Sequence, residues 1–343
     1  MPISADKFSA EAAHKTKLSS EKRPDFFIVG APKCGTTALA AYLAAHPDIY
    51  MAQKEMHFFG ADLHFGPQFF RRDCDAYRAE FAQWNGQTRT GEASVWYLFS
   101  KQAAAEIKAY SPDARIVILL REPVSMLYSL YHQFLYDGNE HLPSFEEALA
   151  AENDRGMGQR ITRETYFVQG LAYRAVVRFT EQVQRYFDLF GRERVHVIIY
   201  DDLAADTIGT YRATLSFLGV SNSVDIPIGP INTNMSVKSP FLRVILNDPL
   251  VRGTAIALRS WLPKPFFSLV QNVGISISEL NKRPAQRHPM DHGLKLTLQR
   301  EFAPEVERLS ALLNRDLTHW SKSGTSATPF LRPVPLSEKR ATV

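Results

Sequence analysis

At 343 residues the chain is long enough to bury a large core, and its 45% hydrophobic and 22% charged content is ordinary for a globular protein. The net charge of +4 suits an anionic ligand, but it is too small to predict nucleic-acid binding, and no run of Lys or Arg forms a basic arm. The only two cysteines, Cys34 and Cys74, indicate a reducing compartment rather than a disulfide scaffold.

The N-terminal stretch, residues 1–24, is polar and charged and predicts a flexible leader. It contains no apolar segment of the kind found in signal peptides. Nowhere does the sequence offer the roughly 18 uninterrupted apolar residues that a membrane span needs. We therefore expect no transmembrane segment.

The segment 25–51 predicts a strand, a tight loop and a helix. Phe26–Val29 is short, apolar and rich in aromatic and β-branched residues, as a buried parallel strand requires. Gly30–Gly35 forms the loop, and an Ala/Leu-rich helix begins at Thr36 and ends before Pro47. Such a turn aims backbone N–H groups and the positive end of a helix dipole at one anion.

This loop differs from the Gly-x4-Gly-Lys-Ser/Thr pattern of nucleotide triphosphatases at an informative place. Thr36 stands where the lysine should be, and the lysine lies inside the loop as Lys33. The loop therefore predicts a site for a phosphate-like group that is not built as in an ATPase.

Strands alternate with helices along the next part of the chain, which predicts an α/β fold with a parallel sheet between helical layers. The strongest strand is Arg115–Leu120, which turns at Arg121-Glu122-Pro123 into a helix. Residues 61–89 have no clear period and predict loop and short helix. Further strands are expected at Ile49–Met51, Thr90–Trp96 and Val195–Tyr200, and further helices at Lys101–Tyr110, Ser144–Ala150 (with a Ser144/Glu147 capping box), Thr165–Phe190, Asp206–Leu218 and Leu294–Leu317.

The pattern degrades between residues 232 and 290, where prolines interrupt short apolar pieces. Prolines and aromatic residues in this region suggest a lid over an acceptor pocket. Its basic residues among Leu, Ile, Trp and Phe also permit a peripheral membrane contact, and an ordinary packing segment is the alternative. The tail 321–343 is rich in Ser, Thr and Pro and predicts a C-terminal arm.

Three motifs together resemble a known family: Phe-Ile-Val-Gly-Ala-Pro-Lys-Cys-Gly-Thr-Thr, Lys-Glu-Met-His-Phe-Phe and Arg-Glu-Pro-Val-Ser-Met-Leu-Tyr-Ser. They are similar to the sulfotransferases that use 3′-phosphoadenosine-5′-phosphosulfate (PAPS), above all the branch with heparan sulfate N- and 3-O-sulfotransferases and bacterial relatives. The resemblance runs with gaps from Phe26 to Trp320. It implies a P-loop-like, three-layer fold over residues 25–320. It also implies PAPS as donor, 3′-phosphoadenosine 5′-phosphate (PAP) as product, and a hydroxyl or amine acceptor, with a carbohydrate as the expected class.

The resemblance implies that the loop holds the 5′ end of the donor. Backbone N–H groups of Lys33, Cys34 and Gly35, with the hydroxyls of Thr36 and Thr37, can bond phosphate oxygens. The ammonium of Lys33 can neutralise charge that builds on the bridging oxygen as the sulfuryl group departs. The alternative is a glycine turn with a solvated lysine.

For the 3′-phosphate the resemblance implies Arg121 and Ser129, which match the family's Arg-x-Pro-x5-Ser segment. Arg121 follows a central strand, at the edge where open α/β sheets bind ligands. An arginine that caps a strand, and a serine bonded within its own helix, are the structural alternative.

Glu55 is the implied general base, because it matches the glutamate of the family's Glu-x-His-Phe-Phe segment. A carboxylate can take the acceptor's proton if partial burial raises its pKa. His57 lies on the same side if the segment is extended, and it can orient the acceptor or share the proton. A surface glutamate and a hydrogen-bonded core histidine are the alternatives.

The chain also departs from the heparan sulfate 3-O branch. There a lysine follows the glutamate that corresponds to Glu92, but here Ala93 stands at that position, which counts against a heparan-type acceptor. Glu92 itself can assist catalysis or pair with a cation. The late basic residues Lys282, Arg283 and Arg287 can form the loop that relatives close over the donor, or they can be a solvated loop.

No residues have metal-ligand spacing, and the implied reaction needs no metal. Golgi members of the family usually carry a membrane anchor, so we expect a bacterial, cytoplasmic enzyme here. Two other functions remain open at this point: a P-loop kinase or NTPase, and a non-catalytic module that binds nucleotides or glycans.

Overall fold

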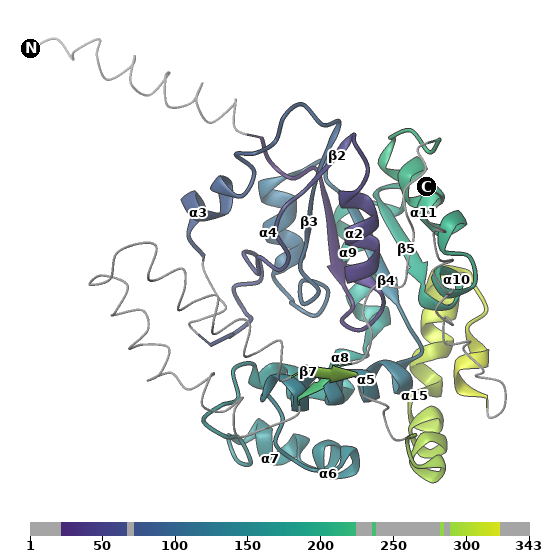
Figure 1. The fold of residues 1–343 in the computed structure, drawn as a ribbon. Helices are drawn as coiled ribbons and strands as arrows, with labels where there is room; N and C mark the ends of the chain where they lie inside the picture. Colours follow the sequence, from purple (N-terminus) through teal and green to yellow (C-terminus); the bar gives the residue numbers. More distant parts are fainter. Residues whose placement is uncertain (1–21, 67–71, 224–234, 238–281, 285–288, 323–343) are drawn as a thin grey trace, which may run out of the picture.

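The computed structural model describes residues 22–66, 72–223, 235–237, 282–284 and 289–322. Its centre is a five-stranded sheet in the order β2-β3-β1-β4-β5, and every neighbouring pair is parallel (Figure 1). The strands are β1 (Phe26–Gly30), β2 (Ile49–Met51), β3 (Arg89–Ala93), β4 (Arg115–Leu120) and β5 (Val195–Ile199). The predicted α/β fold with a central parallel sheet is confirmed.

The composition of the strands agrees with their places in the sheet. The central strands β1 and β4 are apolar along almost their whole length and buried, as strands covered on both faces must be. Parallel neighbours need crossover helices, and right-handed crossovers fix the face on which each helix lies. Because α2 (Thr36–Ala44) leads from β1 toward β2 and α4 (Ala103–Tyr110) leads from β3 toward β4, the two helices cover opposite faces of the sheet.

Other helices complete the two layers. α4 packs on α9 (Phe179–Phe190), which lies against β4 and β5, and α15 (His292–Leu313) packs on α9 from outside. On the other face α2 meets α11 (Thr207–Leu218), where the rings of Tyr42 and Tyr211 are 6.5 Å apart. The result is a three-layer arrangement with the sheet in the middle.

The prediction of one helix over Thr165–Phe190 is wrong. The segment is broken into a 3-10 turn at Val168–Leu171, a short helix α8 (Tyr173–Val176) and α9. Buried side chains supply the backbone partners that a continuous helix would have supplied. The Asn139 side chain accepts from the N–H groups of Tyr166 and Phe167 and donates to the Phe167 carbonyl. Tertiary contacts therefore override local helix propensity here.

Several other expectations are confirmed within a few residues. α5 (Pro123–Asp137) starts with proline at its first position, and Gly191 ends α9. The Ser144 hydroxyl accepts from the Glu147 N–H at the start of α6 (Phe145–Ala150). β3 stops at Ala93 rather than Trp96. The remaining α-helices of the described residues are the short α3 (Cys74–Ala79), α7 (Glu152–Gly156) and α10 (Tyr200–Ala205).

The region 232–290 is described only in part. β6 (Met235–Val237) pairs antiparallel with β7 (Lys282–Pro284), and β6 lies close to α5. The rest of the expected acceptor lid lies outside the described residues, as do Arg287 and nearly all of the leader and the C-terminal arm. The acceptor lid, the leader and the C-terminal arm therefore stay predictions. Within the described part of the chain, no helix is both long and apolar enough to cross a lipid bilayer.

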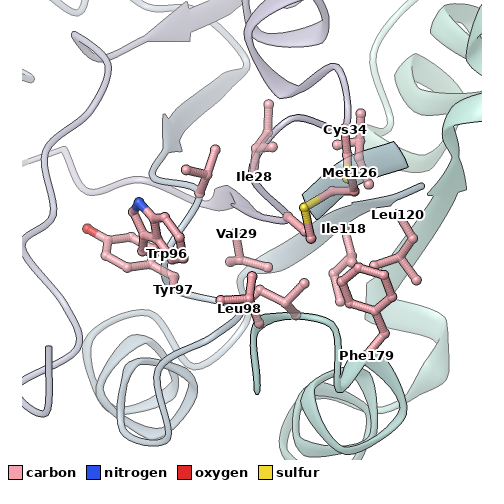
Figure 2. Packing of buried hydrophobic residues seen from close by; sticks show 14 of the residues in the cluster. Ile28, Val29, Cys34, Trp96, Tyr97, Leu98, Ile118, Leu120, Met126 and Phe179 are labelled. Atoms are coloured by element: carbon pink, nitrogen blue, oxygen red, sulfur yellow. The ribbon is translucent and has the colours of Figure 1, made fainter. Parts of the chain in front are cut away.

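The hydrophobic core joins the sheet to the segment that follows β3. Trp96, Tyr97 and Leu98 reach into the core beside Val29 (Figure 2), and the Leu98 N–H donates to the Val29 carbonyl at 2.7 Å. Cys34 lies in the same core near Met126 of α5 (Figure 2). The proposed anion loop is therefore anchored from beneath by its own cysteine side chain.

Gly91 offers a test of this packing. A Cβ built there would lie 2.1 Å from the Phe26 ring and 2.5 Å from the Met51 sulfur. We expect Gly91→Ala to lower the free energy of unfolding by about 1–3 kcal/mol or more through overpacking, measured by chemical denaturation. Gly156→Ala is the matched control, because nothing lies within 4 Å of that Cβ. Equal stability of the two variants would contradict the packing described.

Candidate functional site

The loop between β1 and α2 has the conformation that an anion site requires. Lys33 has a φ of 63° and Gly35 a φ of 91°, both in the left-handed region. The N-cap residue of α2 is Gly35, which has no side chain to cap the first N–H groups of the helix. These groups, at the positive end of the helix dipole, can therefore serve a ligand.

Cys34 faces away from the loop's ligand side. Its thiol is fully buried and lies 3.4 Å from the Pro32 carbonyl oxygen, to which it donates. Burial raises the pKa of this thiol to about 12, although the positive charges of Arg121 and Lys33 act in the opposite direction. Cys34 can therefore contribute to an anion site only through its backbone N–H.

Lys33 and Arg121 connect the loop to the carboxyl end of β4. The Lys33 ammonium donates to Gln133 Oε1 on α5 at 3.0 Å. The Arg121 guanidinium donates to the Lys33 carbonyl at 3.3 Å and lies over the Tyr200 ring, 4.5 Å from its centre. Ser129, one α5 turn before Gln133, is buried, with 3% of its surface exposed. The two predicted grips are thus neighbours joined by a main-chain contact.

Glu55 and His57 form a pair in the loop that follows β2. His57 Nε2 lies 3.0 Å from Glu55 Oε2, and the His57 ring stacks on Phe65 at 4.4 Å. The segment is not extended at His57, whose φ is 47°, yet the ring still reaches the carboxylate. The predicted pairing of Glu55 with His57 therefore arises from a turn rather than from strand alternation.

Lys54 joins this pair to the anion loop. Its ammonium donates to the hydroxyls of Thr37 at 2.7 Å and Thr36 at 3.3 Å, and it lies 3.3 Å from Glu55 Oε1. Sequence reasoning did not select Lys54. The signal was present, because a lysine directly before the proposed base, in a loop that returns to the first helix, can reach both.

Electrostatics keep Glu55 ionised. Burial favours the neutral acid, but the His57 hydrogen bond and the positive charge of Lys54 outweigh it and lower the pKa of Glu55. The condition named for a general base, a pKa raised by burial, is therefore not met in the protein alone. A lowered pKa means that ionised Glu55 adds stability above the ordinary glutamate pKa, and that this stability is lost as the pH falls through the lowered value.

Glu92 is held by hydroxyl groups of neighbouring side chains. It is fully buried and accepts from Tyr77 and Tyr97 at 2.5 Å each and from Ser94 at 2.9 Å. The hydroxyls of Ser94 and Tyr97 in turn accept from four consecutive backbone N–H groups, those of residues 56–59. Burial raises the pKa of Glu92, and these hydroxyl donors oppose that rise. Glu92 therefore anchors the loop that carries Glu55 and His57.

The structure brings the selected residues into two groups of contacts, which the main chain from Lys33 to Thr37 connects. Lys33 contacts Arg121, Lys54 links Thr36 and Thr37 to Glu55, and Glu55 contacts His57. Lys282 and Arg283 lie in β7, for which the structure gives the backbone pairing. Among the described residues, no group of three or more His, Cys, Asp and Glu side chains could hold a metal ion.

Comparison with known proteins agrees with this site. Residues 24–223 match the model of the sulfotransferase family, and the chain belongs to that family. The crystal structure of a sulfotransferase from Alicyclobacillus acidocaldarius is 33% identical; the alignment covers 88% of this chain and 100% of that chain, with a TM-score of 0.63. Its fold is the P-loop-like fold expected from the sequence.

Curated relatives add detail about the branch. Mouse (Mus musculus) heparan sulfate glucosamine 3-O-sulfotransferase 3A1 is 29% identical over 205 residues, which are 60% of this chain and 48% of the relative. The bifunctional heparan sulfate N-deacetylase/N-sulfotransferase 1 of Caenorhabditis briggsae is 24% identical over 237 residues, 68% of this chain and 26% of the relative. The chain thus spans about half of the former and a quarter of the latter. Family membership favours sulfuryl transfer over the kinase or NTPase alternative.

Glu92→Gln tests the anchoring role. The amide turns one acceptor oxygen into a donor that faces donating hydroxyls, so we expect a loss of about 1–3 kcal/mol in the free energy of unfolding. Chemical denaturation measures it, with the exposed Glu164→Gln as control. An unchanged stability would show that these buried hydrogen bonds are not needed.

Proposed function

We propose that this protein transfers the sulfuryl group of PAPS to a hydroxyl or amine, with a carbohydrate as the acceptor class. The observation that carries the proposal is the Lys54–Glu55–His57 cluster beside the first helical residues of α2. It sets a candidate base directly beside an anion site. Family membership and the names of the heparan sulfate relatives support the reaction and the acceptor class.

The reaction is an in-line displacement at sulfur. The acceptor oxygen or nitrogen forms a bond to sulfur while the bond between sulfur and the bridging oxygen of the 5′-phosphate breaks. The electron pair of the broken bond stays on that oxygen and yields PAP, and the acceptor's proton passes to Glu55 and then to solvent. As in phosphoryl transfer, positioning and charge stabilisation supply most of the rate acceleration.

The remaining residues act on the two ends of the donor. The anion loop, with Thr36 and Thr37, binds the 5′ end, and Lys33 offsets the charge that develops on the leaving phosphate. Arg121 and Ser129 bind the 3′-phosphate. His57 orients Glu55 and shares its proton. One observation supports this role. His57 Nδ1 is buried without a hydrogen-bond partner among the described residues, so it can still form a hydrogen bond to the substrate that receives the sulfuryl group.

Ala93 bears on the choice of acceptor. The lysine expected at this position in the heparan sulfate 3-O branch is absent, and Ala93 is fully buried. The acceptor therefore does not use a cation here. We propose a carbohydrate acceptor that need not carry the dense negative charge of heparan sulfate, and we place the enzyme in a bacterial cytoplasm.

Glu55→Gln tests the base. The protein is incubated with 35S-labelled PAPS and a panel of glycans, lipids and small alcohols, and label transfer is measured. Wild type should label at least one acceptor. The Glu55→Gln variant should still bind PAP, but its kcat should be lower by about 100-fold or more. Because the pKa of Glu55 is lowered, the decline of kcat/KM on the acid side of its pH profile should have its midpoint below the pKa of an ordinary glutamate.

Glu164→Gln serves as the control for that experiment, because Glu164 is exposed and lies outside the cluster. Transfer by Glu55→Gln at the wild-type rate would remove Glu55 as the base. A wild type that binds PAP but labels no member of the panel would favour the non-catalytic binding module.

Arg121→Ala tests the 3′ assignment. Loss of a charge-assisted contact should weaken PAP binding roughly 10- to 100-fold in calorimetry, with a smaller effect on adenosine 5′-phosphate, which lacks the 3′-phosphate. The control is Arg308→Ala, because the Arg308 side chain is 62% exposed. Unchanged PAP affinity in Arg121→Ala would contradict the assignment.

A further inference from the structure

The ammonium of Lys54 lies where an anion would be expected. Its two hydroxyl partners, Thr37 and Thr36, belong to the first turn of α2, where the helix dipole is positive. A cation at this end of a helix is electrostatically unfavourable. In the described part of the chain, the carboxylate of Glu55, 3.3 Å away, offsets that cost.

Burial makes the position of Lys54 more unfavourable still. The side chain is 21% exposed, and removal from water lowers its pKa, although the charge and hydrogen bond of Glu55 act in the opposite direction. A largely desolvated ammonium whose counter-ion, within the described residues, is one carboxylate gains from a second anion. The surroundings of Lys54 therefore favour the arrival of a negatively charged ligand.

Lys33, the lysine of the anion loop, does not occupy the position beside the α2 threonines. The Lys33 ammonium contacts Gln133 on α5, whereas Lys54 contacts the α2 threonines and Glu55. Lys33 belongs to the anion loop itself and turns toward α5, whereas Lys54 reaches the start of α2 from the loop after β2. A ligand oxygen at the start of α2 has Lys54 within reach through the threonine hydroxyls.

We propose that Lys54 binds the 5′-phosphate of the sulfuryl donor and couples it to the base Glu55. This inference rests on the proposed function and assigns to Lys54 a contact that the family motif did not suggest. The Thr36 and Thr37 hydroxyls now accept from the ammonium. When a phosphate is present they can rotate to donate to it, because a hydroxyl both donates and accepts, and the ammonium has three protons to share among phosphate and carboxylate.

The same contact makes the pKa of Glu55 depend on whether the donor is bound. Lys54 lowers the pKa of Glu55, together with His57. A dianionic phosphate that shares Lys54 weakens its hold on Glu55, so that Glu55 becomes more basic when the donor is bound. Tyr166 also interacts electrostatically with Glu55, from the segment before α8, but burial raises the pKa of Tyr166 and keeps it neutral.

Lys54→Met is the test, with two nucleotides as probes. PAP carries both phosphates, and adenosine 3′-phosphate lacks the 5′-phosphate. By calorimetry, Lys54→Met should bind PAP roughly 10- to 100-fold more weakly than wild type, and adenosine 3′-phosphate with nearly unchanged affinity. Lys54→Arg, which keeps the charge, should recover much of the loss. The exposed Lys101→Met is the matched control.

The outcomes separate this inference from the proposed function. If wild type and Lys54→Met bind PAP equally well, Lys54 does not contact the 5′-phosphate, and the proposed function is unaffected. If Lys54→Met loses affinity for both nucleotides alike, Lys54 only supports the loop, and the inference is overturned. A wild type that binds no PAP would overturn the proposed function together with the inference.

A second measurement uses the unaltered protein, in case Lys54→Met does not fold. Lysine labelled with 13C at Cε is titrated by NMR, and the Lys54 signal is assigned by its absence from Lys54→Arg. In the free protein Lys54 should titrate below an ordinary lysine, and PAP, but not adenosine 3′-phosphate, should move that titration upward. No difference between the two nucleotides would contradict the contact.

Discussion

The burial of Glu92 is the constraint on which the candidate site depends. A carboxylate removed from water must have its oxygens satisfied, and here hydroxyl groups from Tyr77, Ser94 and Tyr97 do so. Two of those hydroxyls then accept from the backbone N–H groups of residues 56–59. An irregular loop thereby obtains the backbone partners that a strand would have found in a sheet. The loop is held in one conformation, and Glu55 and His57 are held with it.

Two loops meet at the carboxyl edge of the sheet, and their charges are complementary. The loop after β1 brings backbone N–H groups and Lys33, and the loop after β2 brings Lys54 and the carboxylate of Glu55. Arg121 adds a third cation from the end of β4. A parallel sheet places all three segments on one edge, which is where open α/β sheets bind their ligands. The excess of positive groups over Glu55 is the electrostatic feature that supports the proposed donor, which carries two phosphates.

Local sequence patterns predicted the elements with continuous apolar runs or clear caps, such as β4, α5 and the loop before α2. They failed where distant side chains satisfied the backbone, as Asn139 does at Tyr166 and Phe167 in the broken Thr165–Phe190 segment. The candidate residues came from motifs, and the structure brings most of them into two groups of contacts around the loop before α2. The role of Glu92 and the position of Lys54 were not predictable, because each depends on partners far away in sequence whose approach only the fold determines. The lowered pKa of Glu55 has the same origin.

The hydrogen bond from Arg121 to the Lys33 carbonyl has a consequence for how a two-ended nucleotide is recognised. The guanidinium is held by the Tyr200 ring and by the main chain of the very loop that faces the other end of the ligand. A ligand that reorients this side chain would also disturb its hydrogen bond to the loop. The binding free energies of two nucleotides that each carry only one of the phosphates should then sum to less than that of the nucleotide with both. The reason is that binding of the first phosphate orders the contacts for the second. Under the proposed function, the two ends of one small ligand would therefore bind cooperatively.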